Sequence, residues 1–98
     1  MAAGKRTGNL IGRRQRRVNV SETRLKRAFV EVLGVDEDID WSSLAYRSIE
    51  EWDSVAHMQL VAEIEDAFDI MIDTQDVIDM SSYEVAKSIL AKYGVAFD

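Results

Sequence analysis

The stretch EEWDSVAHMQL, residues 50–60, joins a segment without regular periodicity to an amphipathic helix and places a serine at the junction. Asp53 can accept a hydrogen bond from the first free backbone N–H groups of this helix. Ser54 is therefore predicted in the first turn, where it could be a helix cap, a nucleophile or a residue that another protein modifies. The core-facing stripe that follows at helical spacing is Leu60, Val61, Ile64 and Phe68.

Length and composition exclude several classes of function. The chain has 98 residues, enough for one small domain that buries about two thirds of its unfolded surface. It has no cysteine, which excludes disulfides and thiolate zinc ligands, and its one histidine, His57, excludes a site with two or three histidine ligands. No apolar run approaches the roughly 18 residues of a membrane span. We expect a soluble, cytoplasmic, monomeric protein without a structural metal.

Charge is divided unevenly along the sequence. Residues 1–19 contain six of the 12 lysines and arginines and no acid, whereas residues 20–98 contain six basic against 18 acidic residues, a net charge of −12. We predict a basic, disordered arm over residues 1–19 and one acidic domain over residues 20–98. The arm could contact nucleic acid or a membrane or serve as a targeting segment, but a solvated tail is the simpler interpretation. The acidic domain favours basic protein partners over nucleic acid or membrane.

Helical periodicity predicts the remaining elements. The stretch SETRLKRAFVEVLG has apolar residues along one helix face, with Ser21 as N-cap and Gly34 as stop signal. A short third helix is predicted in TQDVIDM with Thr74 as its cap. A fourth is predicted in SSYEVAKSILAKYG, where Ser81 and Glu84 have the spacing of a capping box. With no strand pattern, the fold is predicted to be all-α, a small four-helix bundle.

A long segment without regular periodicity, residues 35–52, separates the first two helices. We expect a loop whose apolar residues anchor it, with Trp41 and Trp52 pinning it to the core. Loops of this length are uncommon in compact domains unless they are functional, and this one leads to Ser54. A phosphate ester on Ser54 would lie at the positive end of the helix dipole, which favours it by about 0.3–1 kcal/mol.

These features together resemble the acyl and peptidyl carrier proteins. The attachment motif of that family, Asp-Ser-Leu at the start of the second helix, is present here as Asp53-Ser54-Val55. The resemblance covers about residues 21–93 and includes the long first loop, an acidic second helix and a short third helix before a capped fourth. It implies a carrier-type four-helix bundle with three longer helices and a short third one.

The resemblance also implies a covalent cofactor and a set of partner enzymes. A phosphopantetheinyl transferase would move 4'-phosphopantetheine from coenzyme A onto Ser54, and the cofactor thiol would carry an acyl or aminoacyl group as a thioester. A loading ligase or transferase and downstream synthase enzymes would then meet the carrier. The chain itself would perform no catalysis, which agrees with its lack of cysteine.

The side of the second helix that faces away from the core stripe is the expected partner surface. Family carriers use this face and the third helix to meet basic patches, although acids on a helix face often serve only solubility. The residues expected here are Asp53, Val55, Met58, Gln59, Ala62, Glu65, Asp66, Asp69, Asp73 and Asp76.

Four positions depart from the pattern of housekeeping fatty-acid carriers. Val55 stands where the family usually has leucine, Ala56 and Gln59 stand at positions that are often acidic, and Trp52 precedes the motif. These differences favour a specialised pathway, such as polyketide, nonribosomal-peptide or surface-glycan modification.

Three alternative interpretations remain open from the sequence. The set Asp53, Ser54 and His57 has the residue types of a hydrolytic triad, but no oxyanion hole or substrate pocket accompanies it. His57 is instead predicted to be a half-buried packing residue that faces the first helix and the loop. The chain could also be a helical interaction module in which Ser54 is only a helix cap, or an adaptor that binds nucleic acid through its arm.

Three methionines, Met58, Met71 and Met80, are expected to fill gaps in the core or line an acyl pocket between the second and third helices.

Overall fold

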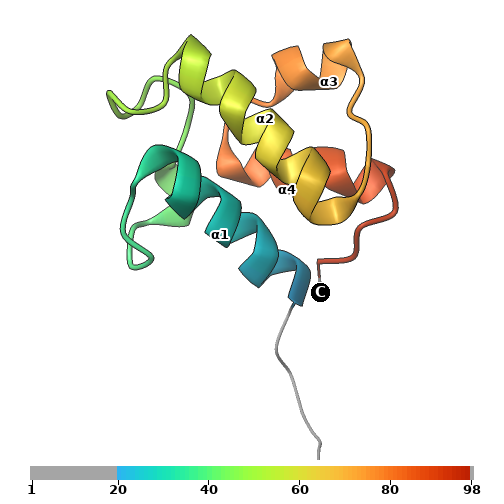
Figure 1. The fold of residues 1–98 in the computed structure, drawn as a ribbon. Coiled ribbons are helices and arrows are strands. Elements are labelled where there is room, and N and C mark those ends of the chain that lie inside the picture. The colour runs from blue at the N-terminus through green and yellow to red at the C-terminus, as the bar shows by residue number, and fades with distance from the viewer. Residues whose placement is uncertain (1–19, 98) are drawn as a thin grey trace, which may run out of the picture.

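The computed structural model describes residues 20–97, which form four α-helices around one core (Figure 1). The predicted basic arm, residues 1–19, lies outside the described residues. The elements are α1 (Val20–Leu33), the 3₁₀ turn η2 (Trp41–Ser43), α2 (Ser54–Phe68), α3 (Thr74–Asp79) and α4 (Tyr83–Lys92). Within residues 20–97 the only β-type pairing is an isolated bridge between Ala45 and Ser82. The all-α, four-helix prediction is confirmed.

Helix α1 ends where the sequence predicts, but it begins at Val20 and not after Ser21. Gly34 follows its last residue at φ 71°, a left-handed conformation that glycine adopts without steric cost, and its N–H donates to Val30 O at 2.9 Å. At the other end the helix starts at Val20, so Ser21 lies inside the first turn and the prediction of Ser21 as N-cap is wrong.

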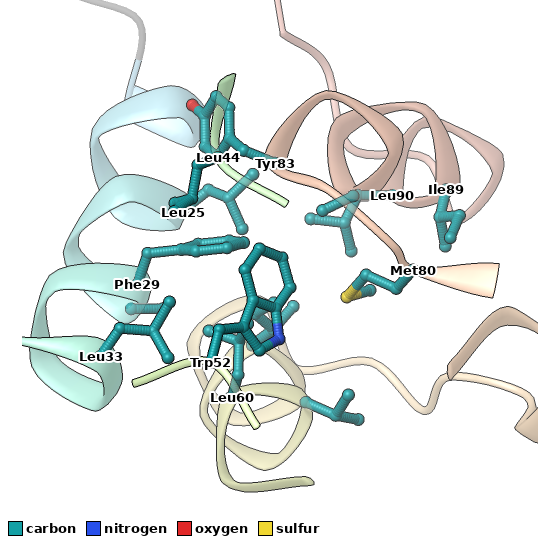
Figure 2. Packing of buried hydrophobic residues seen from close by; sticks show 14 of the residues in the cluster. Leu25, Phe29, Leu33, Leu44, Trp52, Leu60, Met80, Tyr83, Ile89 and Leu90 are labelled. Carbon is teal, nitrogen blue, oxygen red and sulfur yellow. The ribbon is translucent and has the colours of Figure 1, made fainter. Parts of the chain in front are cut away.

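The core is centred on an aromatic side chain from the long loop rather than from a helix. Trp52 is 0% exposed and lies among side chains of α1, α2 and α4 (Figure 2). Phe29 of α1 meets the Trp52 ring edge-on, with centroids 5.4 Å apart, and meets Tyr83 of α4 at the same distance. Aromatic pairs in this geometry add about 0.5–1.5 kcal/mol to the free energy of burial. Trp52 therefore fixes the end of the loop two residues before Ser54, as predicted.

The long loop is ordered by backbone hydrogen bonds to the segment before α4. Tyr46 N donates to Ser81 O at 2.8 Å, and Tyr83 N donates to Leu44 O at 3.0 Å. Within the loop, Arg47 N donates to Trp52 O at 3.1 Å and so closes the turn that precedes the attachment motif. These bonds place the loop beside the connection between α3 and α4, where α4 begins.

Two helix caps differ from the predicted ones. The N-cap of α3 is Asp73, not Thr74, and it makes no side-chain capping bond. The N-cap of α4 is Ser82, whose Oγ accepts from Val85 N at 3.0 Å, so the predicted capping box of Ser81 and Glu84 is wrong by one residue. The shift has a tertiary cause, because the bridge between Ala45 and Ser82 keeps the chain extended through Ser82, so the helix begins only at Tyr83.

Candidate cofactor-attachment site

Ser54 is the first residue of α2 and is exposed. The capping function belongs to its neighbour, because Asp53 Oδ1 accepts from Ala56 N at 2.9 Å. The Ser54 hydroxyl has no hydrogen-bond partner among residues 20–97. The hypothesis that Ser54 serves only as a helix cap is therefore wrong, whereas the prediction of Asp53 as cap is confirmed.

The backbone at this point favours an anion bound through the Ser54 oxygen. Helix α2 has 15 residues and its axis begins at Ser54, so its dipole presents partial positive charge to any group attached there. Asp53 occupies the N–H of Ala56, and the N–H groups of Ser54 and Val55 are among those that no helical carbonyl pairs. A phosphodiester on Ser54 would gain about 0.3–1 kcal/mol from this field.

His57 lies one turn further along α2 and has both ring nitrogens engaged. Trp52 Nε1–H donates to His57 Nδ1 at 2.9 Å. Because an indole nitrogen can only donate, the imidazole proton must be on Nε2, and Nε2–H donates to Val77 O at 2.8 Å. The imidazole therefore has no free lone pair to accept the Ser54 proton, and the hydrolytic interpretation loses its general base.

The half-buried position predicted for His57 is confirmed, but its predicted orientation toward the first helix is wrong. Its ring lies edge to edge with that of Trp52, with centroids 6.0 Å apart and planes at 19°, as their hydrogen bond requires, and it meets the Tyr46 ring edge-on at 5.6 Å. It thus faces the loop and α3. The cause is its place at the N-terminal end of α2, where the loop and α3 are the neighbours.

A cavity of about 340 Å³ opens directly beside Ser54. Its walls come from the loop, from α2, from α3 and from the connection that follows α3. Apolar side chains supply most of the wall, and no lysine, arginine, aspartate or glutamate lines it. The lining residues are Tyr46, Ser54, His57, Met58, Val77, Ile78, Met80 and Ser81.

Two exposed apolar side chains, Met58 and Ile78, line this cavity, and other exposed apolar side chains lie elsewhere on α2 and on the chain that follows it. Val55 and Met58 of the predicted surface are 66% and 58% exposed. Met71 and Ile78 are also largely exposed, and Ile78 of α3 was missed because its helix is too short to show a clear period. Met80 is fully buried and Met58 lines the cavity between α2 and α3, as expected, whereas Met71 is 82% exposed and does neither.

Most of the predicted partner surface is available to another protein. The residues that are exposed are Asp53, Val55, Met58, Gln59, Ala62, Asp66, Asp69 and Asp73. Glu65 is half-buried, because its Oε2 accepts from Ile72 N at 2.9 Å and so ties the end of α2 to the chain before α3.

Asp76 does not belong to that surface. The residue is 8% exposed and its carboxylate accepts from Lys92 Nζ and from Tyr93 Oη, each at 2.7 Å. Tyr93 Oη also accepts from Asp73 N at 2.9 Å. The hydrogen bond and charge of Lys92, together with the bond from Tyr93, hold the pKa of Asp76 below its ordinary value. Asp76 therefore fastens α3 to the end of α4.

Comparison with protein families identifies the chain. It matches the family model described as the phosphopantetheine attachment site over residues 23–89, more than half of its length. The chain belongs to this family, whose members carry covalently attached 4'-phosphopantetheine. No curated protein and no solved structure matches it. Within residues 20–97, no helix is long and apolar enough to cross a membrane.

Proposed function

We propose that the protein is an acyl carrier protein modified on Ser54. The observation that carries the proposal is an exposed, unpartnered serine hydroxyl at the start of α2, within the residues that match the phosphopantetheine family. A phosphopantetheinyl transferase would join the Ser54 oxygen to the phosphate of 4'-phosphopantetheine while the phosphoanhydride bond of coenzyme A breaks. The base that accepts the Ser54 proton would belong to the transferase, because His57 has no free nitrogen.

The cavity beside Ser54 supports an acyl rather than an aminoacyl cargo. When attached, the cofactor supplies a terminal thiol that holds the cargo as a thioester. An acyl chain could be buried between Met58, Val77 and Ile78. Burial would stabilise it by about 0.8 kcal/mol of free energy per methylene. An aminoacyl ammonium would find no carboxylate in that lining, and burying it unpaired is costly.

The exposed face of α2 is the proposed partner surface, and the energetics at Asp69 support it. Asp69 has a left-handed backbone, φ 55°, and ends α2, where its negative charge opposes the helix dipole. Both features disfavour the folded state, so another role for this carboxylate is indicated. Asp66, Asp69 and Asp73 would meet basic patches on the transferase, the loading ligase or transferase, and the synthase enzymes.

The pathway and the cellular location are proposed from the residues beside the attachment motif and from the charge of the domain. Val55, Ala56, Gln59 and Trp52 favour a specialised fatty-acid, polyketide or nonribosomal-type pathway rather than housekeeping synthesis. We propose a non-catalytic, monomeric carrier in the cytoplasm, where coenzyme A and its transferase meet it, with residues 20–98 as the carrier domain. The acidity of this domain makes nucleic acid and anionic membrane unfavourable partners.

The test is the intact mass after incubation with coenzyme A, Mg²⁺ and a broad-specificity phosphopantetheinyl transferase. We expect the wild type and a Ser81→Ala variant to gain one phosphopantetheine, and Ser54→Ala to gain none. Ser81 is a matched control because it lines the same cavity. If the folded wild type gains no mass with this enzyme or its cognate transferase, the proposal is wrong and a helical interaction module, with Asp53 as the cap of α2, replaces it.

A further inference from the structure

A single imidazole connects three elements around the attachment site. His57 of α2 accepts from Trp52, at the buried end of the loop, and donates to the Val77 carbonyl of α3. Trp52 lies two residues before Ser54 and His57 lies three residues after it. The two hydrogen bonds, 2.9 and 2.8 Å long, are therefore made by residues close to Ser54, where the cofactor would be attached.

Helix α3 depends on such bonds because it buries little of its own. It has six residues, too few to be stable in isolation, and its only buried residue is the carboxylate-bearing Asp76. One polar tether joins Asp76 to Lys92 and Tyr93 at the end of α4. The other joins Val77 to His57 on the side of α2, so the two tethers hold neighbouring residues of α3 against different helices.

The His57 tether coincides with a wall of the cavity. His57 and Met58 line it from α2, and Val77 and Ile78 line it from α3. The 2.8 Å bond from His57 to Val77 thus fixes how far apart these two walls stand. If the bond is lost, α3 keeps its attachment to α4 and the partly buried side chain of Val77, but it loses its hydrogen bond to the wall of the cavity that α2 supplies.

We propose that His57 is a positioning residue that holds α3 across the cavity and so determines whether an acyl chain is sheltered there. The inference rests on the proposed carrier function. His57 contributes through geometry alone: it touches neither the phosphate nor the thioester in any step, and its Nε2–H and Nδ1 are used on Val77 and Trp52.

The chain offers matched variants that separate this role from packing. His57→Gln keeps one acceptor for Trp52 and one donor for Val77, whereas His57→Leu keeps the bulk and loses both. Circular dichroism and urea unfolding establish which variants are folded.

The experiment measures the protection of a thioester. Wild type, His57→Leu and His57→Gln are loaded on Ser54 with acetyl- or octanoyl-phosphopantetheine, and cleavage by hydroxylamine is followed by mass. We expect the wild type to cleave its octanoyl thioester several-fold more slowly than its acetyl thioester. We expect this ratio to fall toward one in His57→Leu and to be largely restored in His57→Gln. An unchanged ratio in folded His57→Leu would overturn the proposal.

Two measurements do not need the cofactor. The ¹⁵N spectrum of the wild-type imidazole should show His57 protonated at Nε2 and not at Nδ1, and the opposite tautomer would contradict the proposal. Hydrogen–deuterium exchange of unmodified His57→Leu should show faster exchange in α3 than in the wild type, with α1 unchanged, because the bond to Val77 is lost. Because both use the apo protein, they test the tether even if Ser54 proves not to be modified.

Discussion

Helices α2 and α3 meet the rest of the molecule in different ways, although both border the attachment site. Helix α2 packs on α1 and contributes fully buried apolar side chains to the core, among them Ile64 and Leu60, which Figure 2 shows. Helix α3 lies at the edge of the bundle and is held by hydrogen bonds of Asp76 and of the Val77 carbonyl (Figure 1). Apolar burial holds α2, whereas α3 is held mainly by these hydrogen bonds and by the partly buried side chain of Val77.

This difference suggests a division of tasks within a very small protein. Under the proposed function, a partner enzyme would meet Ser54 at a constant place, which the aromatic cluster of Phe29, Trp52 and Tyr83 provides. Cargo would enter and leave the cavity, which requires an element whose opening costs little. The predictions below test whether the two regions are as independent as their contacts indicate.

The largest effect is expected at the centre of the rigid region. Trp52→Ala removes a fully buried indole and leaves His57 Nδ1 without its donor, so it should lower the free energy of unfolding by about 3–5 kcal/mol. Urea unfolding followed by circular dichroism measures this loss. A loss below about 1 kcal/mol would show that the aromatic cluster does not hold the loop, against the ordinary cost of such a cavity.

A smaller and more local effect is expected at the α4 tether. Asp76→Asn keeps the shape of the side chain but removes its charge, which weakens the bonds from Lys92 and Tyr93. Hydrogen–deuterium exchange should become faster in α3 and remain unchanged in α1. Tyr93→Phe, which removes only the hydroxyl, is the matched control and should give a weaker change in the same direction. Equal acceleration in α1 would show that the two regions are coupled.

Acid should weaken first the hydrogen bonds of Glu22 on α1 and then, at lower pH, those of Asp76 on α3. Burial raises the pKa of Glu22, but hydrogen bonds from Tyr83 and Lys87 outweigh it and hold that pKa below the ordinary 4.5. The pKa of Asp76 is likewise held below its ordinary 3.8, chiefly by Lys92. A carboxylate with a lowered folded pKa stabilises the protein above its unfolded pKa, and this stability is lost as pH falls through the folded pKa.

The urea midpoint should therefore begin to fall below pH 4.5 through Glu22 and to fall further below pH 3.8 through Asp76. Measuring the midpoint against pH for the wild type, Glu22→Gln and Asp76→Asn checks this. Each variant should lose its own part of the pH dependence. A Glu22→Gln curve as steep as that of the wild type would contradict the assignment.

The smallest effect on stability is expected at the end of α2. Asp69→Asn keeps a side chain that tolerates the left-handed backbone and removes the charge that opposes the helix dipole, so it should stabilise the fold by about 0.3–1 kcal/mol. The same variant should slow modification of Ser54 by the transferase if Asp69 lies on the partner surface. A stability gain without slower modification would remove Asp69 from that surface.

The sequence by itself determined the helices, the cap at Asp53, the stop at Gly34 and the place of Ser54 at the start of α2. These features depend on residues close together in the chain, where helical spacing and capping preferences operate. The family resemblance, which the match over residues 23–89 confirms, rests on the same local pattern.

Only the tertiary structure decided how the surroundings of Ser54 are held together. Nothing in the sequence distinguishes Asp76 from an exposed acid. It is buried because Lys92 and Tyr93 reach it from the end of α4. His57 resembles half of a catalytic pair, and it is engaged because Trp52 and a backbone carbonyl on α3 take both of its nitrogens. A carbonyl acceptor leaves no mark in the sequence, since every residue has one, and only folding decides which side chain it meets.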